Sequence, residues 1–167
     1  MEINSNLFSS ESKKGTANPN IPYKSAVGAL IYLTQATRPD LAYAVSSVSR
    51  FNSNYDTSHW EAVKRILRYL QKTKDLCLQY SQDKNSNLIG YCDASHGCDG
   101  HDARSVSGYI FIMQGGAVSW NSRRQQTVAL SSTEAEYLSL TAAAQEAIWL
   151  KNITVELEIQ PRKSYLL

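Results

Sequence analysis

The sequence predicts an α+β fold in which a helical segment is followed by short antiparallel strands and then one long helix. From Tyr23 to about Lys74 the apolar residues recur three or four positions apart, which is the spacing of amphipathic helices. After Asp75 the period changes to two, in short runs rich in β-branched and aromatic residues. From Ser131 to about Leu157 a helical pattern returns. Separate runs of helices and strands in this order are typical of α+β proteins.

The helical segment is predicted to contain three helices after a lead-in. Residues 1–22 are rich in Asn, Ser, Lys and Pro and show no helical or strand period, so we expect a flexible lead-in. Pro39 separates the first two helices, because the residue before a proline leaves the α region and proline suits a helix's first turn. Asp56, Thr57 or Ser58 can cap the third helix. The apolar positions that define the three helices are Val27, Leu30, Ile31, Leu33, Leu41, Val45, Val48, Trp60, Val63, Ile66, Leu67 and Leu70.

The strand segment is predicted from four short runs. Leu76, Leu78 and Tyr80 alternate with polar residues and predict a first strand. The runs LIGYCDAS, SVSGYIFIM and GAVSW predict three more strands with hairpin-like links. The long helix opens with two possible capping boxes, one from Ser131 to Glu134 and one from Thr133 to Glu136.

Composition limits the function classes without choosing one. The 167 residues are 43% hydrophobic and 19% charged, enough for one good core or two small ones. A net charge of +2 is too small to mark a nucleic-acid binder, so local basic patches must carry that case. No apolar run is long enough to span a bilayer or to act as a secretory signal, so we expect an intracellular protein, cytoplasmic or nuclear, with no membrane partner. The three cysteines lack C-x-x-C spacing and favour reduced thiols over a disulfide or zinc site.

Several separated stretches resemble one family in that family's own order. They are YKSAVGALIYLTQATRPDLAYAVSSVSRF, HWEAVKRILRYLQKT, GYCDAS, ARSVSGYIF, AVSWNSRRQQTVALSSTEAEYLSL and EAIWL. Together they resemble the copia-type LTR retrotransposon Pol polyprotein, from the end of reverse transcriptase into ribonuclease H. The resemblance implies a reverse-transcriptase thumb- or connection-like segment over 23–82 and a partial, ribonuclease H-like domain over 83–160. The beginning of a further strand would then occupy 161–167.

The resemblance implies two site residues. The family's ribonuclease H cuts the RNA strand of an RNA–DNA hybrid with carboxylates that hold two divalent ions, Mg²⁺ or Mn²⁺. Its first acid lies in a motif matched by GYCDAS, which gives Asp93, and its second in a segment matched by TEAEY, which gives Glu136. Residues two apart on a helix point about 200° away from each other, so Glu134 and Glu136 cannot both face one metal pair. Glu134 is then left as the capping partner of Ser131.

The family's third and fourth acids, in motifs like D-N-Q and H-I-D, have no match in these residues. We therefore expect a retrotransposon fragment with an incomplete metal site and no nuclease activity by itself. One alternative is an active hybrid ribonuclease completed by Asp99, Asp102 or Glu158, or by a partner chain. Another is a domesticated protein-binding module whose open sheet edge pairs with a partner strand.

Two patches could contact nucleic acid. Lys64, Arg65, Arg68 and Lys72 form a basic face on the third predicted helix, with Tyr69 and His59 near it, although a solvated helix face explains these charges equally well. Arg123 and Arg124 precede the long helix, and the Ser132 hydroxyl at its start could meet a phosphate or serve in capping. The expected partners are an RNA–DNA hybrid or other nucleic acid, the rest of the polyprotein, or a partner strand.

Overall fold

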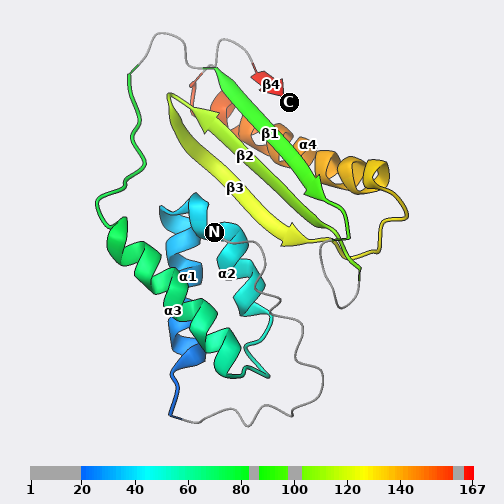
Figure 1. The fold of residues 1–167 in the computed structure, drawn as a ribbon. Helices are drawn as coiled ribbons and strands as arrows, with labels where there is room; N and C mark the ends of the chain where they lie inside the picture. Colours follow the sequence, from blue (N-terminus) through cyan, green and yellow to red (C-terminus); the bar gives the residue numbers. More distant parts are fainter. Residues whose placement is uncertain (1–19, 83–86, 98–102, 160–163) are drawn as a thin grey trace. The chain divides into compact units, whose positions relative to one another are not determined.

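The computed structural model describes residues 20–82, 87–97, 103–159 and 164–167 (Figure 1). The chain divides into two compact units, one ending at Cys77 and one beginning at Leu78, which we call the helical unit and the sheet unit. Residues 1–19 of the predicted lead-in lie outside the described residues. The combination of helices with a four-stranded mixed sheet confirms the predicted α+β class.

The helical unit contains the three predicted helices. They are α1 (Tyr23–Ala36), α2 (Ala42–Ser49) and α3 (Thr57–Lys72), and a 3-10 turn, η1 (Pro39–Leu41), leads into α2. Pro39 occupies the first position of that turn, as the separation of the first two helices predicted.

The helical unit has a core of large apolar side chains from all three helices. Tyr23, Val27 and Leu30 of α1 pack with residues of α2 and α3. The Tyr23 ring stacks on Tyr55 with centroids 4.5 Å apart, and its hydroxyl donates a 2.7 Å hydrogen bond to the Val48 carbonyl. Burial, followed by the charge of Asp56, raises the pKa of Tyr23 to about 12. Leu67, which was predicted among the apolar helix positions, is 40% exposed and lies outside this core.

Two polar arrangements fix the ends of α3. Asp56 caps its N-terminus, accepting hydrogen bonds from the backbone N–H groups of Ser58 and His59, while His59 Nδ1 accepts from the Asp56 N–H. At the other end the buried Arg38 donates to both carboxylate oxygens of Asp40, at 2.9 and 2.8 Å, and to the backbone and hydroxyl oxygens of Thr73. His59 is buried in this cap, so its predicted place near the basic face is wrong.

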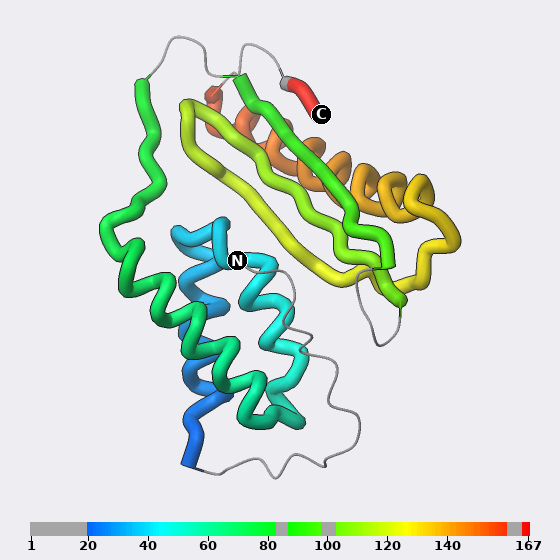
Figure 2. Tube along the Cα trace, in the orientation of Figure 1, coloured from blue at the N-terminus to red at the C-terminus, as the bar shows by residue number. Residues whose placement is uncertain are grey.

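The sheet unit is a four-stranded sheet in the order β3-β2-β1-β4 with one helix packed on it. The strands β1 (Leu88–Ser95), β2 (Val106–Met113) and β3 (Gly116–Arg124) are antiparallel, whereas β4 (Ser164–Leu166) pairs in parallel with the beginning of β1. Figure 2 shows the chain end of β4 beside β1.

The predicted strand around Leu76–Tyr80 is wrong, because this segment is irregular. Its packing explains why. Ser81 N–H donates to the Gln114 carbonyl in the β2–β3 turn, and the Tyr80 hydroxyl donates to the Ala117 carbonyl at 2.7 Å. The Tyr80 ring lies so close to Gly116 that a β-carbon there would come within 2.5 Å of it. Tyr80 thus packs against the β2–β3 turn instead of belonging to a strand.

The long helix α4 (Ser132–Glu156) lies across one face of the sheet (Figure 1). Ala135, Ser139 and Ala143, four residues apart, are fully buried against it, and small side chains at this spacing allow close contact between helix and sheet. Phe111 of β2, Leu88 of β1 and Leu150 of α4 complete the core of the sheet unit. Across the described residues, no helix is both long and apolar enough to cross a membrane.

Candidate functional site

Asp93 lies in the second half of β1, opposite Gly108 of β2. Successive side chains of a strand point to opposite faces, and the neighbouring Cys92 packs with the core beneath α4. The Asp93 side chain therefore points to the other face of the sheet, where it is exposed. Gly108 opposite it has no side chain that could cover the carboxylate.

Glu136 lies in the second turn of α4 and is exposed. Glu134, two residues earlier, acts at the helix start as predicted. Its N–H donates to Ser131 Oγ at 3.1 Å, and its Oε2 accepts from the Leu130 N–H at 2.6 Å. The reciprocal bond thus reaches Leu130 rather than Ser131. With Glu134 engaged there, Glu136 is the carboxylate of this segment left for other chemistry.

Ser139 connects the two predicted site residues. Its buried hydroxyl donates to the Asp93 carbonyl at 2.7 Å and lies 3.3 Å from the Gly108 carbonyl. Ser139 is three positions after Glu136, so this bond holds the helix turn that carries Glu136 against the strand that carries Asp93. Sequence reasoning missed Ser139, although the spacing of Ala135, Ser139 and Ala143 could have indicated a packed helix face.

Cys92 is within the electrostatic reach of both carboxylates. Burial, followed by the charges of Glu136 and Asp93, raises the pKa of the Cys92 thiol. Two carboxylates supply the hard oxygen ligands that Mg²⁺ and Mn²⁺ prefer. Within the described ranges no group of three or more His, Cys, Asp or Glu side chains could hold a metal ion.

The basic residues predicted on the third helix share one exposed stripe of α3. Lys64, Arg65, Arg68 and Lys72 are all exposed, and Arg68 Nε donates to the Lys64 carbonyl one turn earlier. The buried residues Val63 and Ile66 occupy the opposite side of the helix. The stripe belongs to the helical unit, whereas Asp93 and Glu136 belong to the sheet unit.

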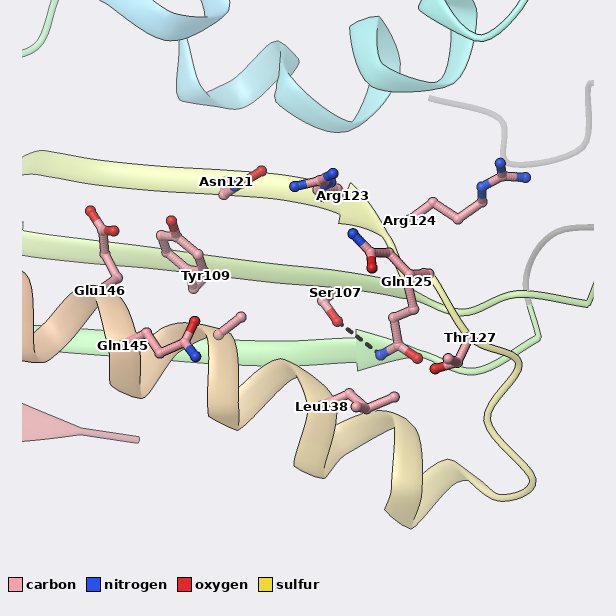
Figure 3. Close-up of a pocket in the computed structure, with 12 residues that line it drawn as sticks. Ser107, Tyr109, Asn121, Arg123, Arg124, Gln125, Thr127, Leu138, Gln145 and Glu146 are labelled. Atoms are coloured by element: carbon pink, nitrogen blue, oxygen red, sulfur yellow. Dashed lines mark hydrogen bonds between the residues drawn. The ribbon is translucent and has the colours of Figure 1, made fainter.

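The other predicted nucleic-acid contacts lie at the end of β3 and the start of α4. Arg123 pairs with Ser107 of β2, and Ser132 is the first residue of α4 and is exposed, while Ser131 makes the cap. Between β3, the loop after it and α4 lies a pocket of about 570 Å³, shown in Figure 3. Arg123 and Arg124 both line it, and Figure 3 shows the Arg124 guanidinium directed away from α4.

The chain is similar to curated proteins over most of its length. It is 53% identical over 131 residues to the secreted RxLR effector protein 161 of Plasmopara viticola, an alignment that covers 78% of this chain and 92% of that protein. It is 48% identical over 143 residues to the retrovirus-related Pol polyprotein from transposon TNT 1-94 of Nicotiana tabacum, covering 86% of this chain and 11% of the polyprotein. A third relative, the Pol polyprotein from transposon RE2 of Arabidopsis thaliana, is 40% identical over 147 residues, which are 87% of this chain and 10% of the polyprotein.

The chain belongs to the copia-type retrotransposon Pol polyprotein family. It spans about a tenth of the length of the Pol polyproteins that it matches. No family model and no solved structure matches the chain. Within this Pol family segment, Asp93 and Glu136 come from two elements of the sheet unit joined by Ser139, and the basic stripe of α3 comes from the helical unit.

Proposed function

We propose that the sheet unit is a ribonuclease H-like domain, that the chain as a whole binds RNA–DNA hybrids, and that this chain by itself does not cleave them. The observation that carries the proposal is the 2.7 Å hydrogen bond from Ser139 Oγ to the Asp93 carbonyl, which ties the Glu136 turn of α4 to the Asp93 strand. Carboxylates on a first strand and an early helix turn are the arrangement expected from the family resemblance.

The chemistry of the pair explains the expected lack of cleavage. Hydrolysis of an RNA phosphodiester by two metal ions requires one ion to activate water and one to stabilise the leaving oxygen. Asp93 is exposed on the sheet face away from α4 and Glu136 is exposed on α4 itself, so together the two carboxylates would hold at most one such ion, and only weakly. Because the reaction depends on placing charges to a fraction of an ångström, an incomplete ligand set costs orders of magnitude in rate.

The basic stripe of α3 supports binding to a phosphate backbone. Lys64, Arg68 and Lys72 follow one another every four residues, so they lie along one line on the helix surface. Each phosphate that such a side chain neutralises releases counterions, and the logarithm of the affinity then falls with the logarithm of the salt concentration by about 0.9 per contact on a duplex.

The test measures binding and cleavage together on a labelled RNA–DNA hybrid in Mg²⁺ and in Mn²⁺. We expect salt-dependent binding without cleavage. Replacing Lys64, Arg65, Arg68 and Lys72 together by alanine should weaken binding at least tenfold and lower the salt slope by about 2–4. Lys24→Ala removes one exposed lysine of α1 outside the stripe and, as a control, should change the affinity by less than twofold.

The variant Asp93→Asn with Glu136→Gln tests the metal site. If the parent chain cleaves the hybrid and this variant does not, the proposal that the chain by itself lacks nuclease activity is contradicted. Further metal-binding acids would then have to come from other residues of the chain or from a partner chain. Absence of hybrid binding at low salt would contradict the nucleic-acid function altogether. Isothermal titration with Mn²⁺ should show one weak site that the double variant loses.

A second candidate function, that of a secreted effector, follows from the name of one relative. The letters RxLR denote Arg, any residue, Leu and Arg, and this chain has that string at 65–68. Here it lies inside α3, with Ile66 buried and both arginines exposed. The test measures release of the chain from cells that express it, for the parent and for two double variants. The effector function is supported if Arg65→Ala with Arg68→Ala abolishes release while Lys64→Ala with Lys72→Ala does not. Retention of the parent chain would contradict it.

A further inference from the structure

The pocket of about 570 Å³ is separate from the two carboxylates. Its sheet wall comes from Ser107, Tyr109, Asn121 and Arg123, which pair across β2 and β3 and so share the face that packs on α4. Asp93 points to the opposite face of the same sheet. The other wall is α4, from Leu138 to Glu146. The pocket is thus a second site at the β3 side of the sheet unit.

A buried glutamine builds one end of the pocket. Gln125 is 8% exposed, and its Nε2 donates to Ser107 Oγ at 2.8 Å and to the Ala135 carbonyl at 2.9 Å, as Figure 3 shows for the bond to Ser107. Its Oε1 is also buried and accepts no hydrogen bond from the described residues. A rigid, buried acceptor without a partner is uncommon in proteins and suits a ligand that brings a donor.

The two ends of the pocket carry different polar groups. Arg123, with Gln126 and Thr127 of the loop, provides a positive charge and hydrogen-bond donors at one end. At the other end Glu146 Oε1 accepts from Ser119 Oγ at 2.6 Å beside Tyr109. Burial raises the pKa of Tyr109, a hydrogen bond with Asn121 lowers it, and the charge of Glu146 raises it, so that the net shift is upward.

Apolar contact comes from Leu138 and Ala142 of α4 and from the ring of Tyr109, which all line the pocket. In Figure 3 Leu138 lies at the same end as Gln125 and Thr127, and Tyr109 lies at the other end beside Glu146. The volume lies within the range of about 300–1,000 Å³ that small-molecule sites occupy.

We propose that this pocket binds a nucleoside monophosphate, either free or as the terminal unit of a single strand. The phosphate contacts Arg123, the sugar and base lie along Leu138 and Tyr109, and amino or hydroxyl donors of the ligand reach Glu146 and Gln125. The inference deepens the proposed function, because it takes from it the expectation that the ligand is a nucleic-acid component.

The test is a titration of the whole ¹⁵N-labelled chain with adenosine and cytidine monophosphates, inorganic phosphate and adenosine. We expect submillimolar binding of a monophosphate, with shifts of the Asn121, Gln125 and Thr127 amides, and at least tenfold weaker binding of phosphate or adenosine alone. Arg123→Ala should weaken monophosphate binding at least tenfold. Lys151→Ala, which removes an equal charge from the exposed side of α4, should leave it unchanged.

A second variant keeps the proposal falsifiable if Arg123→Ala disturbs the fold. Leu138→Trp fills the pocket from a partly exposed position and should abolish binding while the amide spectrum outside the pocket stays folded. The proposal is overturned if Leu138→Trp still binds the monophosphate or if phosphate alone binds with equal affinity. It is also overturned if the amides show no shifts at about 5 mM monophosphate, a concentration that would reveal even weak, millimolar binding. A short single strand with a terminal phosphate that binds at least tenfold tighter than the free monophosphate identifies the strand end as the source.

The pocket proposal and the proposed function can fail independently of each other. Asp93→Asn with Glu136→Gln should leave monophosphate binding unchanged, because these carboxylates lie outside the pocket. Monophosphate binding without hybrid binding would support the pocket and contradict the proposed function. Hybrid binding without monophosphate binding would support the proposed function and contradict the pocket proposal.

Discussion

The helical unit is held by large apolar side chains, whereas the sheet unit is held mostly by strand pairing, small side chains and hydrogen bonds. In the helical unit Tyr23, Leu30, Leu41 and Ile66 are almost fully buried. In the described part of the sheet unit only Phe111 and Leu88 are large side chains buried to that degree. Large apolar side chains on the outer side of α4 are exposed instead, among them Tyr137, Ile148, Trp149 and Val155. The sheet unit should therefore be the less stable of the two.

The two units also differ in how they cap their main helices. In the helical unit α3 begins at a charged residue, Asp56, whereas in the sheet unit α4 begins at the neutral Ser131. Burial raises the pKa of Asp56, but hydrogen bonds from Ser58 and the His59 backbone outweigh burial and bring it to about 2. The helical unit should therefore respond to acid through this cap, and the sheet unit should not.

The largest expected effect comes from Phe111→Ala in the sheet unit. Loss of a fully buried phenylalanine costs about 3–5 kcal/mol, and here it removes most of the aromatic volume of a small core. Hydrogen exchange followed by mass spectrometry should show fast exchange over β1–β3 while α1 and α3 keep their protection. Tyr91→Ala, on the exposed face of β1, is the control and should cost under about 1 kcal/mol. Equal loss of protection in α1 would show that the units do not unfold separately.

A smaller effect, about 1–2 kcal/mol, is expected for Asp56→Ala in the helical unit. Asp56 has a lower pKa folded than unfolded, so the unfolded chain binds more protons between about pH 4 and pH 2, and stability falls as the pH drops through that window. Urea unfolding at pH 7 and pH 3 should show this loss in the parent chain. Asp56→Asn keeps an acceptor at the cap, and its helical unit should lose less stability at pH 3 than that of the parent. An equal loss in both would refute this account of the cap.

The smallest effect, about 1 kcal/mol, is expected for Ser131→Ala in the sheet unit. The serine hydroxyl accepts the Glu134 N–H but carries no charge, so the cost of its removal should be nearly the same at pH 7 and pH 5. Ser132→Ala, whose hydroxyl makes no cap, is the neighbouring control. A strongly pH-dependent cost would mean that the Glu134 carboxylate, rather than Ser131, dominates the cap.

Local patterns in the sequence predicted most elements of the fold. The helical spacing of Val27, Val45 and Val63 and the cap at Asp56 depend on nearby residues alone, and the structure confirms them. The strand predicted over Leu76–Tyr80 is wrong, and Tyr80 packs instead at the β2–β3 turn, a tertiary contact that no local pattern specifies. Leu67 belongs to the apolar pattern that predicted α3 but is exposed, because a helix's apolar stripe can be wider than the surface that covers it.

The candidate site was less accessible from sequence. Asp93 and Glu136 came from the family resemblance, since neither residue is distinctive by itself. Their connection through Ser139 depends on which helix face packs on the sheet. The pocket depends on the buried side chain of Gln125, the residue after β3, reaching across to α4. Both are contacts between residues more than nine positions apart, which no local pattern specifies.

The parallel pairing of β4 with β1 has a consequence for the order of folding. The Cys92 N–H donates to the Leu167 carbonyl and the Leu167 N–H to that of Gly90, across a sequence separation of 75 residues from Cys92 to Leu167. Contacts this distant close the longest loop of the sheet unit and gain little until the hairpins and α4 have shortened the remaining path. We therefore expect β4 to join last, so that the strand carrying Asp93 acquires its second neighbour in the final step of folding.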